Sequence, residues 1–168
     1  MRRRLFLLLG VVVLACTLVA AARAAFGIAV APATTTSSAV TLNGLDQTSP
    51  FTATITVSGA VNTGWNITAW APLPVSGANT LGALVVPSQP ADALCSGGAC
   101  SQPTPVGITW PVTVGTTAGG ATKIYNANTS TGKGTNTLTV TFNIPVPAGA
   151  LAATYTTTLT IIGSNSGP

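Results

Sequence analysis

Two alternating runs of apolar and polar side chains dominate the C-terminal part of the chain. Residues 137–144 read T-L-T-V-T-F-N-I, and residues 155–161 read Y-T-T-T-L-T-I. A period of two places successive side chains on opposite faces of an extended chain, and the many β-branched residues suit a half-buried pleated surface. Pro, Gly and Ala join the two runs, so residues 135–162 predict a β-hairpin whose apolar face requires a second layer.

The same alternation recurs along the rest of the chain, between turns that contain Gly, Pro or Asn. It predicts strands at residues 26–31, 39–43, 51–58, 65–71, 81–86, 108–114 and 122–127. Parity places Trp65 in the core and Trp70 on the outward face. Residues 87–107 form the longest irregular stretch, and loops of this length are often functional or disordered. The pattern predicts an all-β, antiparallel sandwich of the immunoglobulin-like, Greek-key type.

The first residues have the pattern of an export signal. A basic start is followed by an apolar run from Leu5 to Ala21 and by the A-x-A motif at residues 22–24. We therefore expect a signal peptide at 1–24, an N-terminal strand and polar connector at 25–38, and the sandwich domain at 39–168. Retention of the apolar run as a membrane anchor is an alternative. Arg3-Arg4-Leu5 leaves Sec and twin-arginine export both open, and Cys16 is a candidate lipidation site.

The basic charge of the chain comes from the expected signal. Four of the six Lys and Arg residues lie within residues 1–24, which leaves Lys123 and Lys133 against the two acids Asp46 and Asp92. The processed chain is therefore formally neutral, which argues against nucleic-acid binding and permits self-association.

The remaining cysteines, Cys95 and Cys100, lie close together in the sequence C-S-G-G-A-C. Export implies an oxidising compartment, so we predict a disulfide between them that holds a small loop. No histidine is present to complete a metal site with them. We therefore expect no metal and no cofactor.

Catalysis is not expected from this composition. Without histidine, the acid–base candidates are Asp46, Asp92, two lysines and two tyrosines. Both acids lie in turn-forming sequences, where Asp commonly hydrogen-bonds the backbone. We predict that the protein is not an enzyme.

Three side chains are candidates for contact with carbohydrate. Exposed aromatic rings stack on sugar rings, and Trp70 is outward by parity. Lys123 and Tyr125 share a parity on a neighbouring predicted strand. We predict a contact surface made of Trp70, Lys123 and Tyr125.

The C-terminal half of the chain resembles a known family. Lys123-Ile124-Tyr125-Asn126-Ala127, the turn Gly132-Lys133-Gly134 and residues 143–161 together resemble the C-terminal half of WxL-type surface domains of Gram-positive bacteria. Thr158-Leu159-Thr160-Ile161 stands where that family has its terminal Trp-x-Leu. The resemblance implies a β-rich module held non-covalently at the cell wall. We therefore expect a secreted, extracellular or wall-associated structural or adhesive protein, with cell-wall polysaccharide, peptidoglycan or another surface protein as its partner.

The chain ends with P-A-G at residues 147–149 and T-Y-T-T-T-L-T at residues 154–160. This ending also resembles subunits of fimbrial and spore-coat-U type, which assemble by strand donation. That resemblance implies that residues 26–31 add to the open sheet edge of a neighbouring subunit, with Phe26, Ile28 and Val30 as the inserted side chains. The alternative function is thus a filament subunit that associates with itself. In either case we expect membrane contact only through the N-terminal segment, if that segment is retained.

Overall fold

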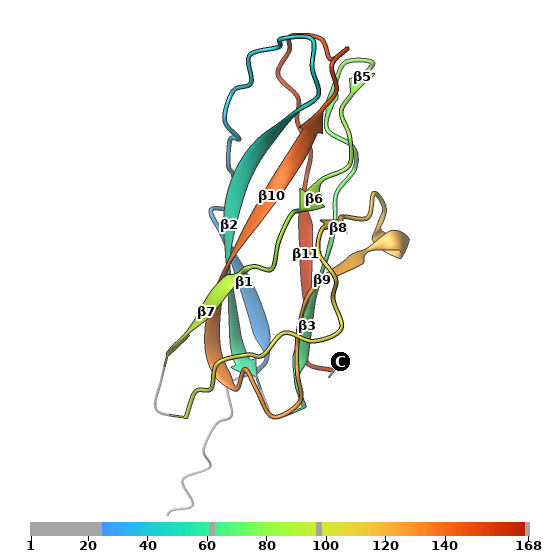
Figure 1. Cartoon of the computed structure of the whole chain (residues 1–168). Helices are drawn as coiled ribbons and strands as arrows, with labels where there is room; N and C mark the ends of the chain where they lie inside the picture. Colours follow the sequence, from blue (N-terminus) through green and yellow to red (C-terminus); the bar gives the residue numbers. More distant parts are fainter. Residues whose placement is uncertain (1–24, 61–62, 97–98, 167–168) are drawn as a thin grey trace, which may run out of the picture.

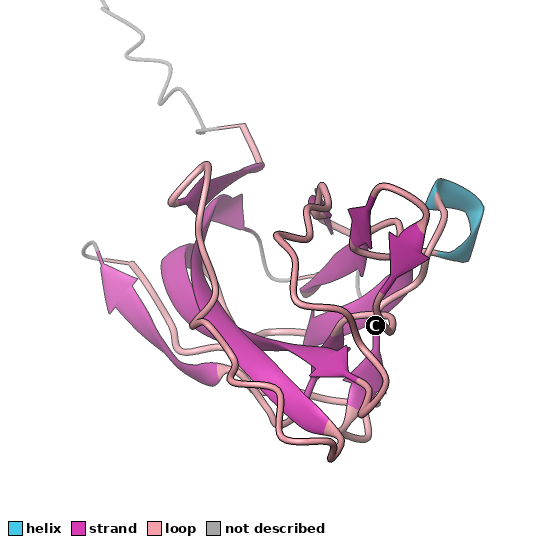
Figure 2. Cartoon of the chain, turned by 90° about the horizontal axis from the view of Figure 1, so that it is seen from above, coloured by secondary structure: helices cyan, strands magenta, loops and turns pink. Residues whose placement is uncertain are grey.

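The computed structural model describes residues 25–60, 63–96 and 99–166. The expected signal at 1–24, with Cys16, lies outside the described residues. Two antiparallel sheets pack against each other, as the two views in Figures 1 and 2 show. The prediction of an all-β sandwich is confirmed. Its immunoglobulin-like, Greek-key type stays a prediction.

The larger sheet, here sheet A, is built around two long strands. Its order is β1 (Gly27–Ala31), β2 (Gln47–Ala60), β10 (Gly134–Val146), β6 (Val85–Val86) and β8 (Val112–Thr113), and β7 (Ala91–Ser96) pairs with another part of β10. The expected N-terminal strand is present as β1, which pairs with β2 of the same chain. It is therefore an integral edge of the sandwich.

The smaller sheet, sheet B, has three strands in the order β11 (Thr160–Ser164), β3 (Trp65–Trp70) and β9 (Thr122–Ala127). A separate ribbon joins β4 (Val75–Ser76) to β5 (Asn79–Thr80), and a single 3-10 turn covers Ala118–Gly120. Strand β1 contacts β11 on one side of the sandwich, and β8 contacts β9 on the other. Both sides of the core are thus closed by strand edges. No helix among the described residues is long and apolar enough to span a membrane.

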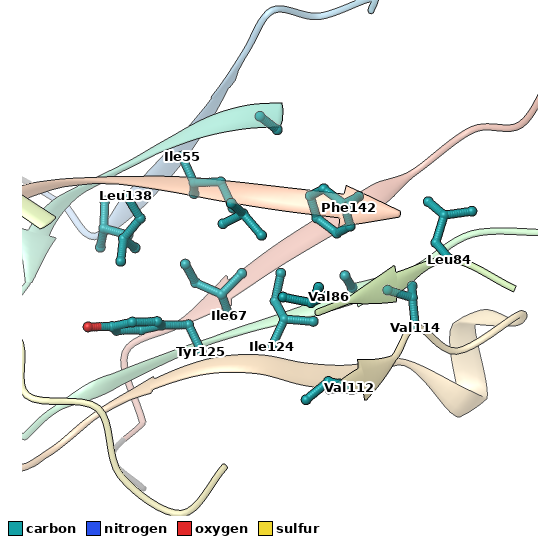
Figure 3. Close-up of a cluster of buried hydrophobic side chains, with 14 of the residues drawn as sticks. Ile55, Ile67, Leu84, Val86, Val112, Val114, Ile124, Tyr125, Leu138 and Phe142 are labelled. Atoms are coloured by element: carbon teal, nitrogen blue, oxygen red, sulfur yellow. The ribbon is translucent and has the colours of Figure 1, made fainter. Parts of the chain in front are cut away.

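The core lies between the inward faces of the two sheets (Figure 3). Sheet A contributes Ile55, Val57, Leu138, Val140 and Phe142, and sheet B contributes Trp65, Ile67, Ala69, Ile124 and Tyr125. Phe51 stacks on Phe142 with ring centroids 5.2 Å apart. The expected core position of Trp65 is confirmed, because its side chain has no exposed surface (0%).

The predicted C-terminal hairpin is wrong. The first run forms β10, but β10 pairs with β2, β6 and β7. The second run is regular only from Thr160 onward, as β11, and pairs with β3 in the other sheet. Residues 147–159 carry the chain across, and Thr156 bridges to Val75 on the way. Both sheets have the same side-chain period, so alternation alone did not reveal that the two runs belong to different layers.

Several predicted strands are shorter than their patterns suggested. Residues 39–43 form no strand, and the chain just before them is held to β2 by the Ser49 hydroxyl, which donates to the Ser38 carbonyl over 2.6 Å. Only the last two residues of 81–86 are in a strand, and only β8 remains of 108–114, where Pro111 lacks a backbone donor. The stretch 87–107 was expected to be irregular throughout, yet it contains β7.

Candidate functional site

The outward face of sheet B carries the candidate carbohydrate contact. On β3, Ile67 and Ala69 are buried in the core. Thr68 and Trp70 alternate with them and therefore point away from the core. In the ladder, Thr68 lies opposite Ile162 of β11 on one side and Lys123 of β9 on the other. The outward residues of this ladder form one surface, which we call the sheet B platform: Thr68, Trp70, Lys123, Thr160 and Ile162.

Trp70 and Lys123 are diagonal neighbours on this platform. Lys123 is opposite Thr68, and Trp70 follows Thr68 by two positions on the same strand. Diagonal side chains on adjacent strands lie about 7–8 Å apart, within reach of a long or aromatic side chain. Trp70 is partly exposed and Lys123 is exposed. The pair therefore places a partly exposed aromatic side chain beside an ammonium group that donates hydrogen bonds.

Tyr125 does not belong to this surface, which corrects the prediction from parity. Its side chain is only 2% exposed, and its ring stacks on Trp65 with centroids 5.3 Å apart. The cause is an irregularity in the β3–β9 ladder. Ile67 pairs with Tyr125 while Thr68 pairs with Lys123, so Ile124 is the extra residue of a bulge. The bulge reverses the parity of β9, and Tyr125 turns into the core.

Ile162 is a member of the platform that the sequence analysis did not single out. It is 48% exposed and faces outward beside Thr68. Its signal was present in the sequence, because Ile161 continues the apolar positions of the alternating run 155–161, and the next residue, Ile162, must then point to the opposite face.

The residues predicted to form a donor strand lie in β1, at the edge of sheet A. Gly27 pairs with Ser58 and Ala31 with Thr54 of the same chain. Phe26 and Ile28 pack against the core, whereas Val30 is 37% exposed. Ile28 occupies the space beside Gly163 of β11, where a Cβ atom would collide with its γ-methyl group. The contact across the two sheets therefore depends on the missing side chain at Gly163.

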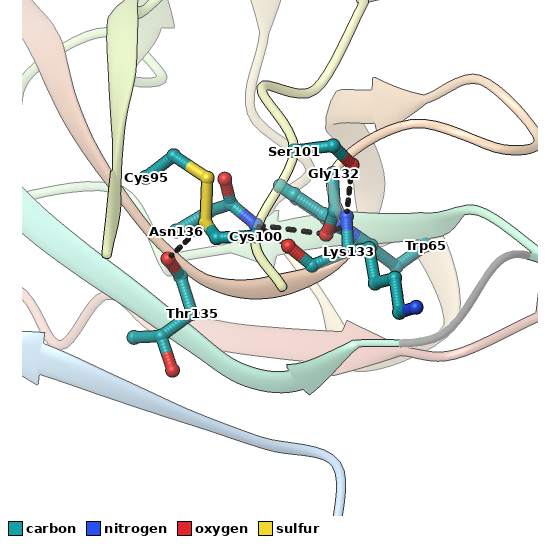
Figure 4. Close-up of a disulfide and its surroundings, with 8 residues drawn as sticks. All are labelled: Trp65, Cys95, Cys100, Ser101, Gly132, Lys133, Thr135 and Asn136. Atoms are coloured by element: carbon teal, nitrogen blue, oxygen red, sulfur yellow. Dashed lines mark hydrogen bonds between the residues drawn. A yellow bond between two sulfur atoms is a disulfide. The ribbon is translucent and has the colours of Figure 1, made fainter. Parts of the chain in front are cut away.

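The predicted disulfide between Cys95 and Cys100 is present, with Cα atoms 5.8 Å apart (Figure 4). It lies at the end of β7, and the Sγ atom of Cys100 is 3.3 Å from the carbonyl oxygen of Thr135. Beyond it, Ser101 exchanges two hydrogen bonds with Lys133, one from each backbone N–H, both 3.0 Å long. The disulfide therefore holds the chain reversal between the end of β7 and Ser101, and Ser101 is hydrogen-bonded to the 128–134 turn.

Of the acid–base candidates, Asp46 has a hydrogen bond with the backbone of another loop. Asp46 accepts a hydrogen bond from the Ala148 N–H over 2.8 Å and so links two loops that are far apart in the sequence. Within 25–60, 63–96 and 99–166, no three His, Cys, Asp or Glu side chains gather as metal ligands.

Comparison of the chain with family models, with curated proteins and with solved structures finds no match.

Proposed function

We propose that the protein is a secreted, cell-envelope-associated β-sandwich with a structural or adhesive, non-catalytic role, and that the sheet B platform contacts cell-wall polysaccharide. The observation that supports this proposal is that Trp70 and Lys123 are diagonal neighbours on one outward face. The indole face packs against the C–H groups of a sugar ring. The ammonium group, with the Thr68 hydroxyl nearby, binds sugar hydroxyl or carboxylate oxygens.

A sedimentation assay with purified cell wall tests the proposal. We expect the processed chain to pellet with wall material, and Trp70→Ala with Lys123→Ala to remove most of the bound fraction. Lys133→Ala is the matched control, because Lys133 is also exposed but lies in the turn before β10, off the platform. The proposal fails if the wild-type chain stays in the supernatant as a monomer by light scattering. Equal losses from Lys123→Ala and Lys133→Ala would reject the platform as the site.

The second candidate function is a filament subunit that assembles by strand donation from residues 26–31. This function expects an N-terminal strand that is unpaired within its own subunit, whereas β1 pairs with β2 of the same chain, so donation requires β1 to leave that sheet edge. The connection at 32–46 contains no strand. An edge strand on a long connection can leave β2 of its own chain and pair with β2 of a second copy. Two copies would then exchange their β1 strands.

Deleting residues 25–36 tests this alternative. We expect the deletion to abolish polymers seen by electron microscopy while circular dichroism still reports the β-sandwich. A synthetic peptide with the sequence of residues 25–31 should then bind the truncated chain. If the wild-type chain forms no polymers at any concentration, the alternative is rejected.

A further inference from the structure

A cavity of about 440 Å³ lies at the end of sheet A where β2 begins and β10 ends, which is the upper end in Figure 1. Its apolar walls are formed by Pro145 and Val146 at the end of β10 and by Pro147, the next residue. Asp46, the residue before β2, lines the same cavity. The cavity therefore combines apolar walls with a negative charge.

The Asp46 carboxylate is held in place and keeps free acceptor positions. Its Oδ1 atom accepts from the Ala148 N–H over 2.8 Å, and no other hydrogen bond reaches this carboxylate from the described residues. Another side of the cavity is closed by Gly82, whose N–H donates to the Pro145 carbonyl over 3.3 Å. An ionised carboxylate has about four acceptor positions, so most remain for a ligand. A cation with N–H donors suits this site best.

Lys133 presents such a cation at the opposite end of the molecule. It lies in the turn before β10, beside the disulfide (Figure 4), and its side chain is exposed. Its backbone is fixed, because its N–H donates to the Ser101 hydroxyl and its carbonyl accepts from the Ser101 N–H, both over 3.0 Å. Within the part of the chain that the structure describes, its ammonium group has no hydrogen-bond or ion-pair partner.

Asp46 and Lys133 are too far apart to pair within one molecule. The 14 residues of β2, from Gln47 to Ala60, span about 40 Å at about 3.3 Å per residue. Asp46 precedes the first of them, and Lys133 lies beside the last, since Gly134 pairs with Ala60. A contact between the two side chains therefore joins two copies of the chain.

We propose that copies of the chain associate end to end, with Lys133 of one copy in the Asp46 cavity of the next. The aliphatic stem of the lysine packs against the apolar walls, while its ammonium group donates to the carboxylate. Such a contact joins two different surfaces, so it propagates from copy to copy into a filament or a closed ring. The formal neutrality of residues 25–168 favours self-association.

The other described lysine, Lys123, does not take part in this contact. It lies on the outward face of sheet B, opposite Thr68, on a side of the sandwich and not at its end. The end-to-end contact therefore leaves the sheet B platform uncovered. The inference goes beyond the proposed polysaccharide contact and uses residues different from those of strand exchange.

Sedimentation velocity of the processed chain over a range of concentrations tests the inference. We expect reversible association that weakens as salt is added. Lys133→Asp and Asp46→Lys should each raise the dissociation constant at least about fivefold. Asp46→Asn should weaken association without disturbing the loop, because its amide oxygen can still accept from Ala148. Lys123→Asp is the matched control and should change nothing, because Lys123 is also exposed but lies off the two ends.

Exchanging the two charges provides a second measurement. Each single reversal places like charges at both ends of the chain, whereas Asp46→Lys with Lys133→Asp in one chain should restore association. Mixing the two single variants should also restore it, because opposite charges meet again. Circular dichroism should show the same fold for all variants, since each substituted side chain is exposed. A wild type that is monomeric at every concentration, no restoration by the exchange, or an equal loss from Lys123→Asp would overturn the inference.

Two further measurements separate this inference from the proposed functions. Deletion of residues 25–36 should leave end-to-end association intact. Association that is lost on this deletion but is insensitive to both charge reversals would overturn the inference in favour of strand exchange. Wall sedimentation at concentrations where the chain is monomeric should be the same for Lys133→Asp and the wild type. The polysaccharide contact and the end-to-end contact can therefore fail independently.

Discussion

The indole Nε1 of Trp65 donates a hydrogen bond to the carbonyl oxygen of Gly132, 2.8 Å away. The same oxygen accepts from the side-chain nitrogen of Asn136, also over 2.8 Å. Figure 4 shows these groups beside the disulfide. One buried carbonyl thus connects β3 of sheet B to β10 of sheet A through the turn between β9 and β10.

Gly132→Ala should lower the free energy of unfolding by at least about 2 kcal/mol. The residue has φ +67°, and a Cβ atom would lie 2.6 Å from Trp65 Nε1 and 2.9 Å from Pro103 Cβ. Urea unfolding measures the change. Gly44→Ala is the control, because Gly44 has φ +78° but nothing within 4 Å of its Cβ position. Equal losses for the two variants would show that backbone strain alone matters and that the contacts at Gly132 do not.

Asn136→Ala should cost about 1–3 kcal/mol of stability, because it removes two hydrogen bonds of a fully buried side chain, each worth about 0.5–1.5 kcal/mol. Asn136 is 0% exposed and donates to the carbonyl oxygens of Gly132 and Lys133. Thermal or urea unfolding measures the loss. Asn79→Ala removes an exposed 3.3 Å bond to the Ser76 carbonyl and should change stability by less than about 0.5 kcal/mol. An unaffected Asn136→Ala variant would contradict the assigned role.

Gly163→Ala and Ile28→Ala should be coupled. A methyl group at Gly163 displaces the Ile28 side chain, and Ile28→Ala removes apolar contact with the core. Each single change should destabilise the domain, whereas the double variant should lose less than the sum, because the smaller side chain makes room for the new methyl group. A double-mutant cycle in urea measures the coupling. Strict additivity would mean that the two residues act independently.

Replacing Cys95 and Cys100 together by Ser should lower stability by about 2 kcal/mol, since the chain-entropy model assigns that value to a loop of this size. Urea unfolding of the wild type with and without reductant should show the same difference. The double variant is its own control, because reductant should not affect it. A wild type that is indifferent to reductant would indicate that the disulfide does not stabilise the fold.

Side-chain alternation predicted the elements whose pairing is regular over many residues. Strands β2 and β10 were expected within 51–58 and 137–144, and each extends further because the two form one continuous ladder. Strand β9 was predicted with its observed bounds, Thr122–Ala127. The cysteine spacing likewise predicted the disulfide correctly. These features depend on neighbouring residues, so they can be read locally.

The candidate site was predictable only where parity is uninterrupted. Trp70 is partly exposed, as expected, because β3 alternates regularly across Ile67 and Ala69. Tyr125 was assigned to the same surface, but the bulge at Ile124 turns it inward. A bulge depends on how two strands fit together, so alternation within one strand does not reveal it.

From residue order alone come the β class, the inward position of Trp65, the formal neutrality of residues 25–168 and the Cys95–Cys100 pair. Only the three-dimensional arrangement assigns the two C-terminal runs to different sheets, pairs β1 with β2 of its own chain and joins Asp46 to Ala148. The physical reason is that a strand's period depends on its own backbone, whereas its partner depends on which distant apolar face covers it. Both sheets present the same alternation, so partner choice is settled by packing across the whole core.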